Sequence, residues 1–152
     1  MATTVDNAQL TVRVTEKVTL NGRDLGNTNT HVITGINEVS ERIFTVPTSQ
    51  VTILSASSAV GAGTYLSSSI QYIRVTNLDD TNFVRLSFAS GSTTGSNTSD
   101  FKLPANRSIM FTSTEFSGSA IGATFGSFSE FTDLKGTADT ASVDIELFVA
   151  TT

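Results

Sequence analysis

Serine and threonine make up almost a third of this 152-residue chain, and they interleave with single apolar residues. The pattern is clearest near the C-terminus, where alternate positions carry Val143, Ile145, Leu147 and Val149. The positions between them are mostly polar, although Phe148 interrupts that series. Because a strand directs alternate side chains to opposite faces, this alternation predicts a strand with one buried face and one wet face.

Similar alternation recurs along the chain between groups of Gly, Asn, Asp and Ser, which favour turns. No segment of helical length repeats apolar residues at the spacing of an amphipathic helix. The sequence therefore predicts an all-β fold: a single β domain over residues 1–152, built as an antiparallel β-sandwich or jelly roll of about eight or nine strands, with a partly closed barrel as the alternative. The expected strands cover residues 8–20, 30–36, 40–46, 51–55, 70–76, 83–89, 101–103, 108–112 and 142–150.

The first expected strand, residues 8–20, places its aliphatic side chains on one face, with Glu16 as the one interruption. A charged residue on an apolar face predicts a bend or bulge near Glu16 and Lys17. Residues 21–27 follow as a turn-rich loop whose Asn and Gly residues suit backbone conformations with positive φ.

Residues 70–76 and 83–89 both alternate, and the connector between them is rich in Asn and Asp, so they predict a β-hairpin. Its second face carries aromatic and arginine side chains, which are enriched in protein–protein interfaces. The alternative is that this face packs inside the domain as part of a sheet. The predicted contact residues are Tyr72, Arg74, Phe83 and Arg85.

A later segment sets large apolar residues among Gly and Ser: Phe116, Ile121, Phe125, Phe128 and Phe131. We expect these side chains to close one end of the sandwich. The alternative is a loop that anchors on a partner protein.

Composition excludes several classes of function. The chain has no Cys, so a disulfide framework and a thiolate metal site are both excluded. Its net charge is −5 and its basic residues are scattered, so no nucleic-acid partner is expected. Only 15% of residues are charged, and such a surface suits packing against another protein. We expect no membrane partner and synthesis in a cytosol, because neither a signal-peptide pattern nor an apolar run of spanning length is found.

The sequence also predicts that the chain is not an enzyme and has no catalytic residue or cofactor. A catalytic triad would need His31, the one His, and no Gly-x-Ser-x-Gly motif accompanies it. Two carboxylate pairs are candidates for glycoside hydrolysis, but sugar sites usually add aromatic platforms and the chain has no Trp. The pairs are Asp79 with Asp80, and Glu38 with Glu41.

Residues 77–82 offer oxygen atoms that could bind calcium: Asn77, Asp79, Asp80 and Asn82. Ca²⁺ takes six to eight oxygen ligands, but the spacing of an EF-hand is absent. Turn formation alone also explains these residue types. No metal site is predicted, and whether this turn binds calcium is left open.

Four stretches resemble small virion structural proteins of tailed phages, particularly phages of cyanobacteria and other marine bacteria. They are residues 10–22 (LTVRVTEKVTLNG), 35–47 (GINEVSERIFTVP), 72–88 (YIRVTNLDDTNFVRLSF) and 101–111 (FKLPANRSIMF). These are strand-and-turn signatures without catalytic motifs.

The resemblance implies a virion protein made in the bacterial host cytoplasm. We expect a capsid decoration or cement protein that binds the major capsid protein or other virion proteins, as a homo-oligomer with a trimer favoured. A tail, neck or fibre-adaptor protein is the first alternative, and a carbohydrate-binding β-sandwich module is the second.

Overall fold

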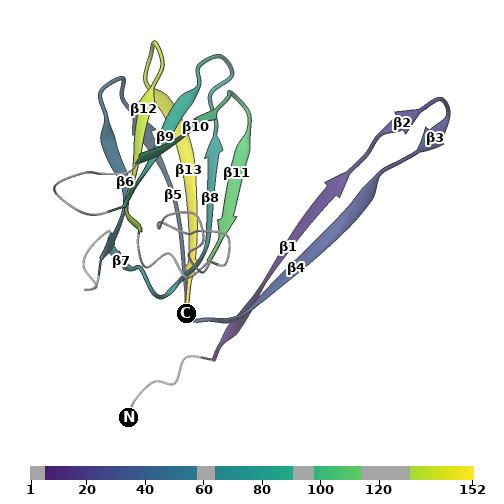
Figure 1. Cartoon of the computed structure of the whole chain (residues 1–152), viewed down its shortest axis with the longest axis horizontal. Helices are drawn as coiled ribbons and strands as arrows, with labels where there is room; N and C mark the ends of the chain where they lie inside the picture. The colour runs from purple at the N-terminus through teal and green to yellow at the C-terminus, as the bar shows by residue number, and fades with distance from the viewer. Residues whose placement is uncertain (1–5, 58–63, 91–97, 114–130) are drawn as a thin grey trace. The chain divides into compact units, whose positions relative to one another are not determined.

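The computed structural model describes residues 6–57, 64–90, 98–113 and 131–152 (Figure 1). These residues form 13 β-strands and no helix, so the prediction of an all-β fold is confirmed. The strands outnumber the eight or nine expected, because residues 8–36 hold four strands where the sequence predicted two, and because β7 (Thr64–Leu66) and β12 (Phe131–Ala138) were not predicted. The predicted role of residues 116–130 lies outside the described part of the chain.

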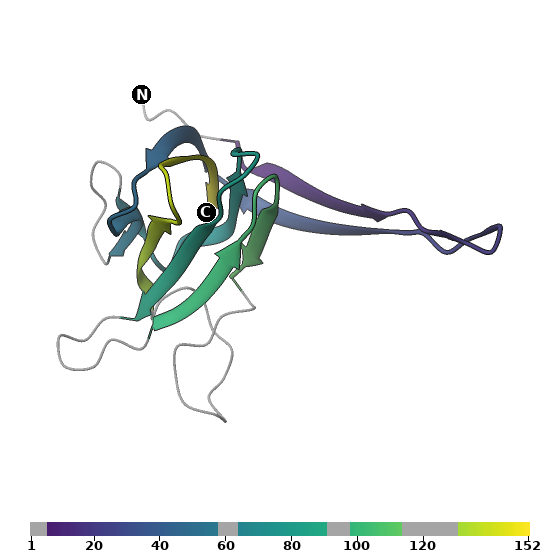
Figure 2. The same ribbon diagram turned by 90° about the horizontal axis from the view of Figure 1, so that it is seen from above.

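The chain divides into two compact units, residues 1–37 and 38–152, where the sequence predicted one β domain. In the first unit, β1 (Ala8–Glu16) pairs antiparallel with β4 (Asn27–Ile36) as a two-stranded ribbon (Figures 1 and 2). The ladder runs without a shift from the pair Gln9–Thr34 to the pair Glu16–Asn27. We call residues 8–36 the N-terminal hairpin.

The tip of the N-terminal hairpin is formed by β2 (Thr19–Leu20) and β3 (Arg23–Asp24). Asn21 and Gly22 between them have φ values of 50° and 76°, as the turn chemistry predicted. The ladder is interrupted between Glu16 and β2, which confirms the predicted irregularity. At that point Gly26 passes so close to the opposite strand that a Cβ would lie 2.3 Å from the carbonyl oxygen of Glu16.

The second unit consists of two sheets. The five-stranded sheet has the order β10-β9-β12-β6-β7, and the four-stranded sheet has the order β11-β8-β13-β5. All neighbours are antiparallel except β6 and β7, and neither sheet closes into a barrel. The bounds are β5 (Glu38–Val46), β6 (Val51–Ser57), β7 (Thr64–Leu66), β8 (Ile70–Asn77), β9 (Val84–Ser90), β10 (Thr98–Leu103), β11 (Ser108–Thr112), β12 (Phe131–Ala138) and β13 (Val143–Thr151).

One hydrophobic core is built from alternate residues of both sheets. The C-terminal strand β13 lies between β8 and β5, and its four aliphatic residues are at most 1% exposed, as the sequence predicted. The largest fully buried side chains include Ile53, Leu54, Ile70, Ile73, Leu86, Leu134, Ile145 and Leu147.

The predicted hairpin of residues 70–76 and 83–89 is wrong. Strand β8 pairs with β11 and β13, whereas β9 pairs with β10 and β12, so the two strands lie in different sheets. Residues 77–82 cross from one sheet to the other. Val75 on β8 and Val84 on β9 are both fully buried, because each faces the core from its own sheet.

Candidate functional surfaces

The first two predicted contact residues, Tyr72 and Arg74, lie on β8 with their side chains on one face. Tyr72 is only 5% exposed; its hydroxyl lies 3.6 Å from the sulfur of Met110, and its ring meets Phe148 edge-on at 6.0 Å. Arg74 forms an ion pair with Glu146 and lies 5.5 Å over the Phe148 ring. These contacts hold Tyr72 inside the fold and leave Arg74 partly accessible.

Burial raises the pKa of the Tyr72 hydroxyl, and the positive charge of Arg74 opposes that rise. The phenol is therefore neutral at physiological pH and serves as an apolar ring with a polar end.

Of the other two predicted contact residues, Arg85 lies on β9 of the five-stranded sheet and Phe83 directly precedes that strand. The ammonium of Lys102 lies 4.2 Å from the Phe83 ring centroid. Arg85 on β9 forms a 2.6 Å ion pair with Asp100, and its side chain is 62% exposed. Because the first pair lies on the four-stranded sheet and Arg85 lies on the other sheet, the structure does not bring the four residues together as one surface. Their role as protein contacts stays a prediction.

The candidate calcium ligands of residues 77–82 already accept hydrogen bonds: those of Asn77, Asp79 and Asp80 come from the connector itself, and that of Asn82 comes from the hydroxyl of Thr140. The carboxylate of Asp79 accepts hydrogen bonds from the backbone N–H groups of Thr81 (2.7 Å) and Asn82 (2.6 Å). These bonds, with that from Asn82 contributing most, hold the pKa of Asp79 below its usual range. Asn77 accepts a 2.9 Å bond from the N–H of Asp79. Turn formation therefore accounts for the side chains of Asn77 and Asp79.

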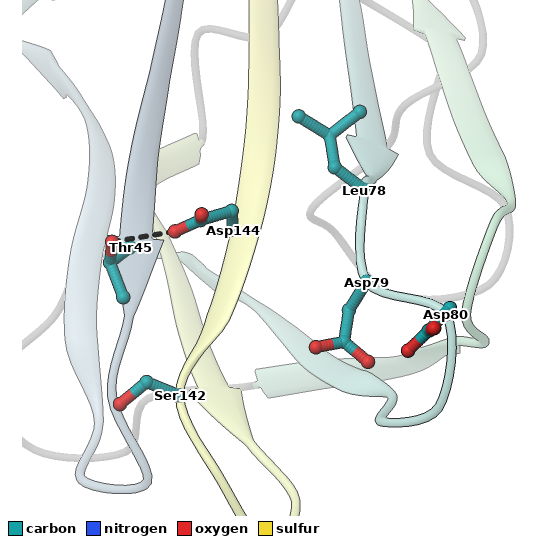
Figure 3. Close-up of a pocket in the computed structure, with 6 residues that line it drawn as sticks. All are labelled: Thr45, Leu78, Asp79, Asp80, Ser142 and Asp144. Atoms are coloured by element: carbon teal, nitrogen blue, oxygen red, sulfur yellow. Dashed lines mark hydrogen bonds between the residues drawn. The ribbon is translucent and has the colours of Figure 1, made fainter.

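An open depression of about 620 Å³ adjoins this connector (Figure 3). Its carboxylates come from separate segments, with Asp79 and Asp80 on the connector and Asp144 on β13. The hydroxyl of Thr45 donates a 2.6 Å hydrogen bond to Asp144. Within the described residues, no three His, Cys, Asp or Glu side chains gather closely enough to hold a metal ion. Leu78 and Ser142 complete the lining.

The structure also places the other residues considered for chemistry. His31 lies exposed on β4, opposite Val12. Glu38 and Glu41 stand three positions apart on β5, so their side chains point to opposite faces of the strand. These two carboxylates therefore do not converge on a common substrate position.

The sequence missed the exposure of the N-terminal hairpin, whose aliphatic residues it expected to face a core. Val14 on β1 is 41% exposed, and the tip residues Val18, Leu20 and Leu25 are 52%, 58% and 60% exposed. The available signal was the Asn21-Gly22 turn, which ends the expected strand after Leu20 and folds the chain back on itself. A strand paired only with its own return cannot bury one face.

The two faces of the hairpin differ in chemistry. The register places Leu10, Val12 and Val14 of β1 on one face, where β4 contributes Ile33, His31 and Asn29 as their partners. The opposite face carries mainly hydroxyl side chains. It has one aliphatic residue, Val32, which is 44% exposed. The aliphatic residues of the first face are therefore concentrated on β1.

None of the described residues belongs to a helix of the length and apolarity needed to cross a membrane. No family model and no curated protein matches the sequence. Among solved structures, the chain is similar to one from Bacillus endospore appendages, described as a novel family of disulfide-linked pili. The two are 12% identical, with a TM-score of 0.47 over 100% of this chain and 96% of that one.

Proposed function

We propose that this chain is a non-enzymatic structural protein of a tailed-phage virion, and that it decorates the capsid by binding the major capsid protein. The observation that carries the proposal is the N-terminal hairpin, a two-stranded ribbon with exposed aliphatic side chains in a compact unit of its own. Isolated two-stranded hairpins are marginally stable in water, so this element gains stability when another protein covers it.

The tip of the hairpin is the proposed anchor. Val18, Leu20 and Leu25 are each more than half exposed, and a 2.8 Å hydrogen bond from the Leu25 N–H to the Val18 carbonyl holds two of them together. Burying such a side chain fully contributes about 1.5–3 kcal/mol. A few residues carry most of the binding energy in many interfaces, and in the proposal these three aliphatic side chains supply it through their burial.

The strand order of the second unit supports a jelly roll as the scaffold of the proposed virion protein. Leaving β7 aside, successive strands pass from one sheet to the other at every step from β5 to β13 except between β9 and β10, which are neighbours in one sheet. We assign this arrangement to an eight-stranded jelly roll with β7 as an added edge strand. Jelly rolls occur in viral capsid proteins and in lectins. The virion assignment itself rests on the sequence resemblance.

The location is tested on purified particles of the phage that encodes the chain. Gold-labelled antibody against the protein should decorate the whole capsid surface in electron micrographs. Labelling confined to the tail or neck would replace capsid decoration with an adaptor role. A protein that is absent from purified particles would refute the virion assignment.

The anchor is tested by sedimenting the purified protein with capsids that lack it. The double variant Leu20→Ser/Leu25→Ser should bind at least tenfold more weakly than the wild type. Leu78→Ser is the matched control, because Leu78 is also an exposed aliphatic residue (43%) but lies in the second unit. Equal losses in both variants would show that the tip has no special role.

A further inference from the structure

The N-terminal hairpin has open sheet edges, since β1 and β4 are the only strands of their sheet in the described chain. Natural proteins usually protect such edges with charged side chains, especially lysine, with proline or bulges, or with a covering segment. Strand β1 contains neither Lys nor Pro, its charged residues are Arg13 and Glu16, and its only register shift is at Ala8, the first residue of the strand. Its edge is therefore open to another strand.

We propose that β1 pairs antiparallel with β1 of a second copy of this chain, about a two-fold axis through Val12. This register uses all nine residues of the strand, because Val12 is the central residue of Ala8–Glu16. It places Val12 opposite its own copy and Leu10 opposite Val14 of the second copy. The two β-hairpins then form one four-stranded sheet in the order β4-β1-β1-β4.

The same register is favourable on the opposite face of the sheet. Thr11 lies opposite Arg13 of the second copy, and Gln9 lies opposite Thr15. No two like charges stand opposite each other at any position, whereas a directly opposed like pair would destabilise the sheet. Arg13 and Glu16, the only charged residues of β1, face uncharged partners.

The distribution of aliphatic residues selects β1 over the other edge. Pairing β1 with β1 brings the three aliphatic residues of each copy side by side. Pairing β4 with β4 would instead bring together Asn29, His31 and Ile33, of which only Ile33 is aliphatic. Pairing β1 with β4 would repeat the mixed contacts, such as Val12 with His31, that exist within one hairpin. Aliphatic cross-strand pairs stabilise a sheet more than such mixed pairs do.

Charge also favours contact through the hairpin. Residues 1–37 contain three basic and three acidic residues, so the net charge of −5 resides entirely in residues 38–152. Two copies that meet through their N-terminal hairpins therefore join neutral units. A sheet of four strands, with aliphatic residues on one face of its two central strands, also exceeds the three strands needed for independent stability, which the two-stranded hairpin lacks.

Introduced cysteines test the register directly, because the chain has no Cys. Val12→Cys should give a disulfide-linked dimer under mild oxidation, since directly opposed strand residues have Cα atoms about 4.5–5.5 Å apart, within the range of a disulfide. His31→Cys is the matched control on the same face of β4, and it should stay monomeric on a non-reducing gel. No cross-link in Val12→Cys would refute the register.

Native mass spectrometry tests the assembly without cross-linking. The wild type should be a concentration-dependent dimer, Val12→Lys should be monomeric because two lysines would meet at the axis, and His31→Lys should remain a dimer. A wild-type trimer would overturn the proposal. In a mixture of the two cysteine variants, cross-linking only between a Val12→Cys chain and a His31→Cys chain would show that β1 pairs with β4 of another copy, and would overturn it too. A wild type that is monomeric at every concentration would overturn it as well. The inference does not depend on the virion assignment.

Discussion

At the scale of single residues, Asn77 is a buried polar residue whose side chain must find all its hydrogen-bond partners inside the second unit. It is 1% exposed, and its side-chain amide donates to the carbonyls of Asn82 (2.9 Å) and Leu103 (3.2 Å). We expect Asn77→Ala to lower the free energy of unfolding by about 2–3 kcal/mol, because buried carbonyls would lose their partners. Urea titration measures the loss. Asn77→Asp keeps the acceptor for the Asp79 N–H but loses both hydrogen bonds that the amide donates, so its unfolding free energy should also fall. If both variants were nearly as stable as the wild type, this account would be wrong.

Asp79 predicts how stability changes with pH. Its backbone hydrogen bonds lower its pKa in the folded state, so the charged form stabilises the fold above the usual carboxyl range. That contribution is lost as the pH falls through the lowered pKa. The difference in unfolding free energy between wild type and Asp79→Asn should therefore be largest near neutral pH and shrink in acid. Chemical denaturation at pH 7, 5 and 3 measures it, and a difference that does not vary with pH would refute it.

These residues also show how far sequence reasoning reached. The turn-forming role of the Asn and Asp residues in 77–82 followed from residue type, because short polar side chains bond to their own backbone. The partner of Asn77 on Leu103 could not be foreseen, since it depends on a strand 26 positions away. For the same reason the sequence could not decide between a contact surface and a packed face for Tyr72: Phe148 and Met110, which cover it, approach from strands β13 and β11.

At the scale of elements, alternation identified strands but not their partners. Strand β13 was predicted correctly because its pattern has one apolar residue at every second position. Strands β8 and β9 show equally clear alternation, yet they belong to different sheets. Alternation specifies which face of a strand is buried. Two successive strands bury the same residues whether they pair as a hairpin or lie in opposite sheets of a sandwich. The six-residue connector was the available signal, since hairpin loops usually have about two to five residues.

The hairpin tip gives a prediction at this scale. A Cβ on Gly26 would meet the Glu16 carbonyl oxygen at 2.3 Å, so Gly26→Ala must displace the backbone that leads to the tip. We expect the Leu25 amide, which bonds to the Val18 carbonyl, to exchange with solvent about tenfold faster in this variant. Gly22→Asn is the control, because Asn tolerates positive φ and the site is open. NMR measures the exchange rate of the Leu25 amide in both variants, and equal rates in Gly26→Ala and Gly22→Asn would contradict the prediction.

At the scale of the whole molecule, composition indicated one domain, but the two units treat their aliphatic residues differently. Residues 38–152 contain the whole core cluster, whereas the N-terminal hairpin exposes most of its large aliphatic residues and buries Ile36 (2% exposed). Sequence pattern could not separate these uses, because an amphipathic strand looks the same whether its own chain or another protein covers it. Charge does separate them, since the whole net charge of −5 belongs to residues 38–152.

This division predicts that residues 38–152 fold without the N-terminal hairpin. All residues of the core cluster lie between Phe44 and Val149, so deleting residues 1–37 removes none of them. We expect the melting temperature to change by less than about 4 °C, which corresponds to about 1 kcal/mol for a domain of this size. Leu147→Ala in the shortened chain is the control for sensitivity: Leu147 is 1% exposed, and its truncation should cost about 2–5 kcal/mol. Calorimetry measures both changes. An element that only binds another protein contributes to stability when its partner is present. A shortened chain without a cooperative transition would therefore show that the hairpin is part of the fold rather than a binding element.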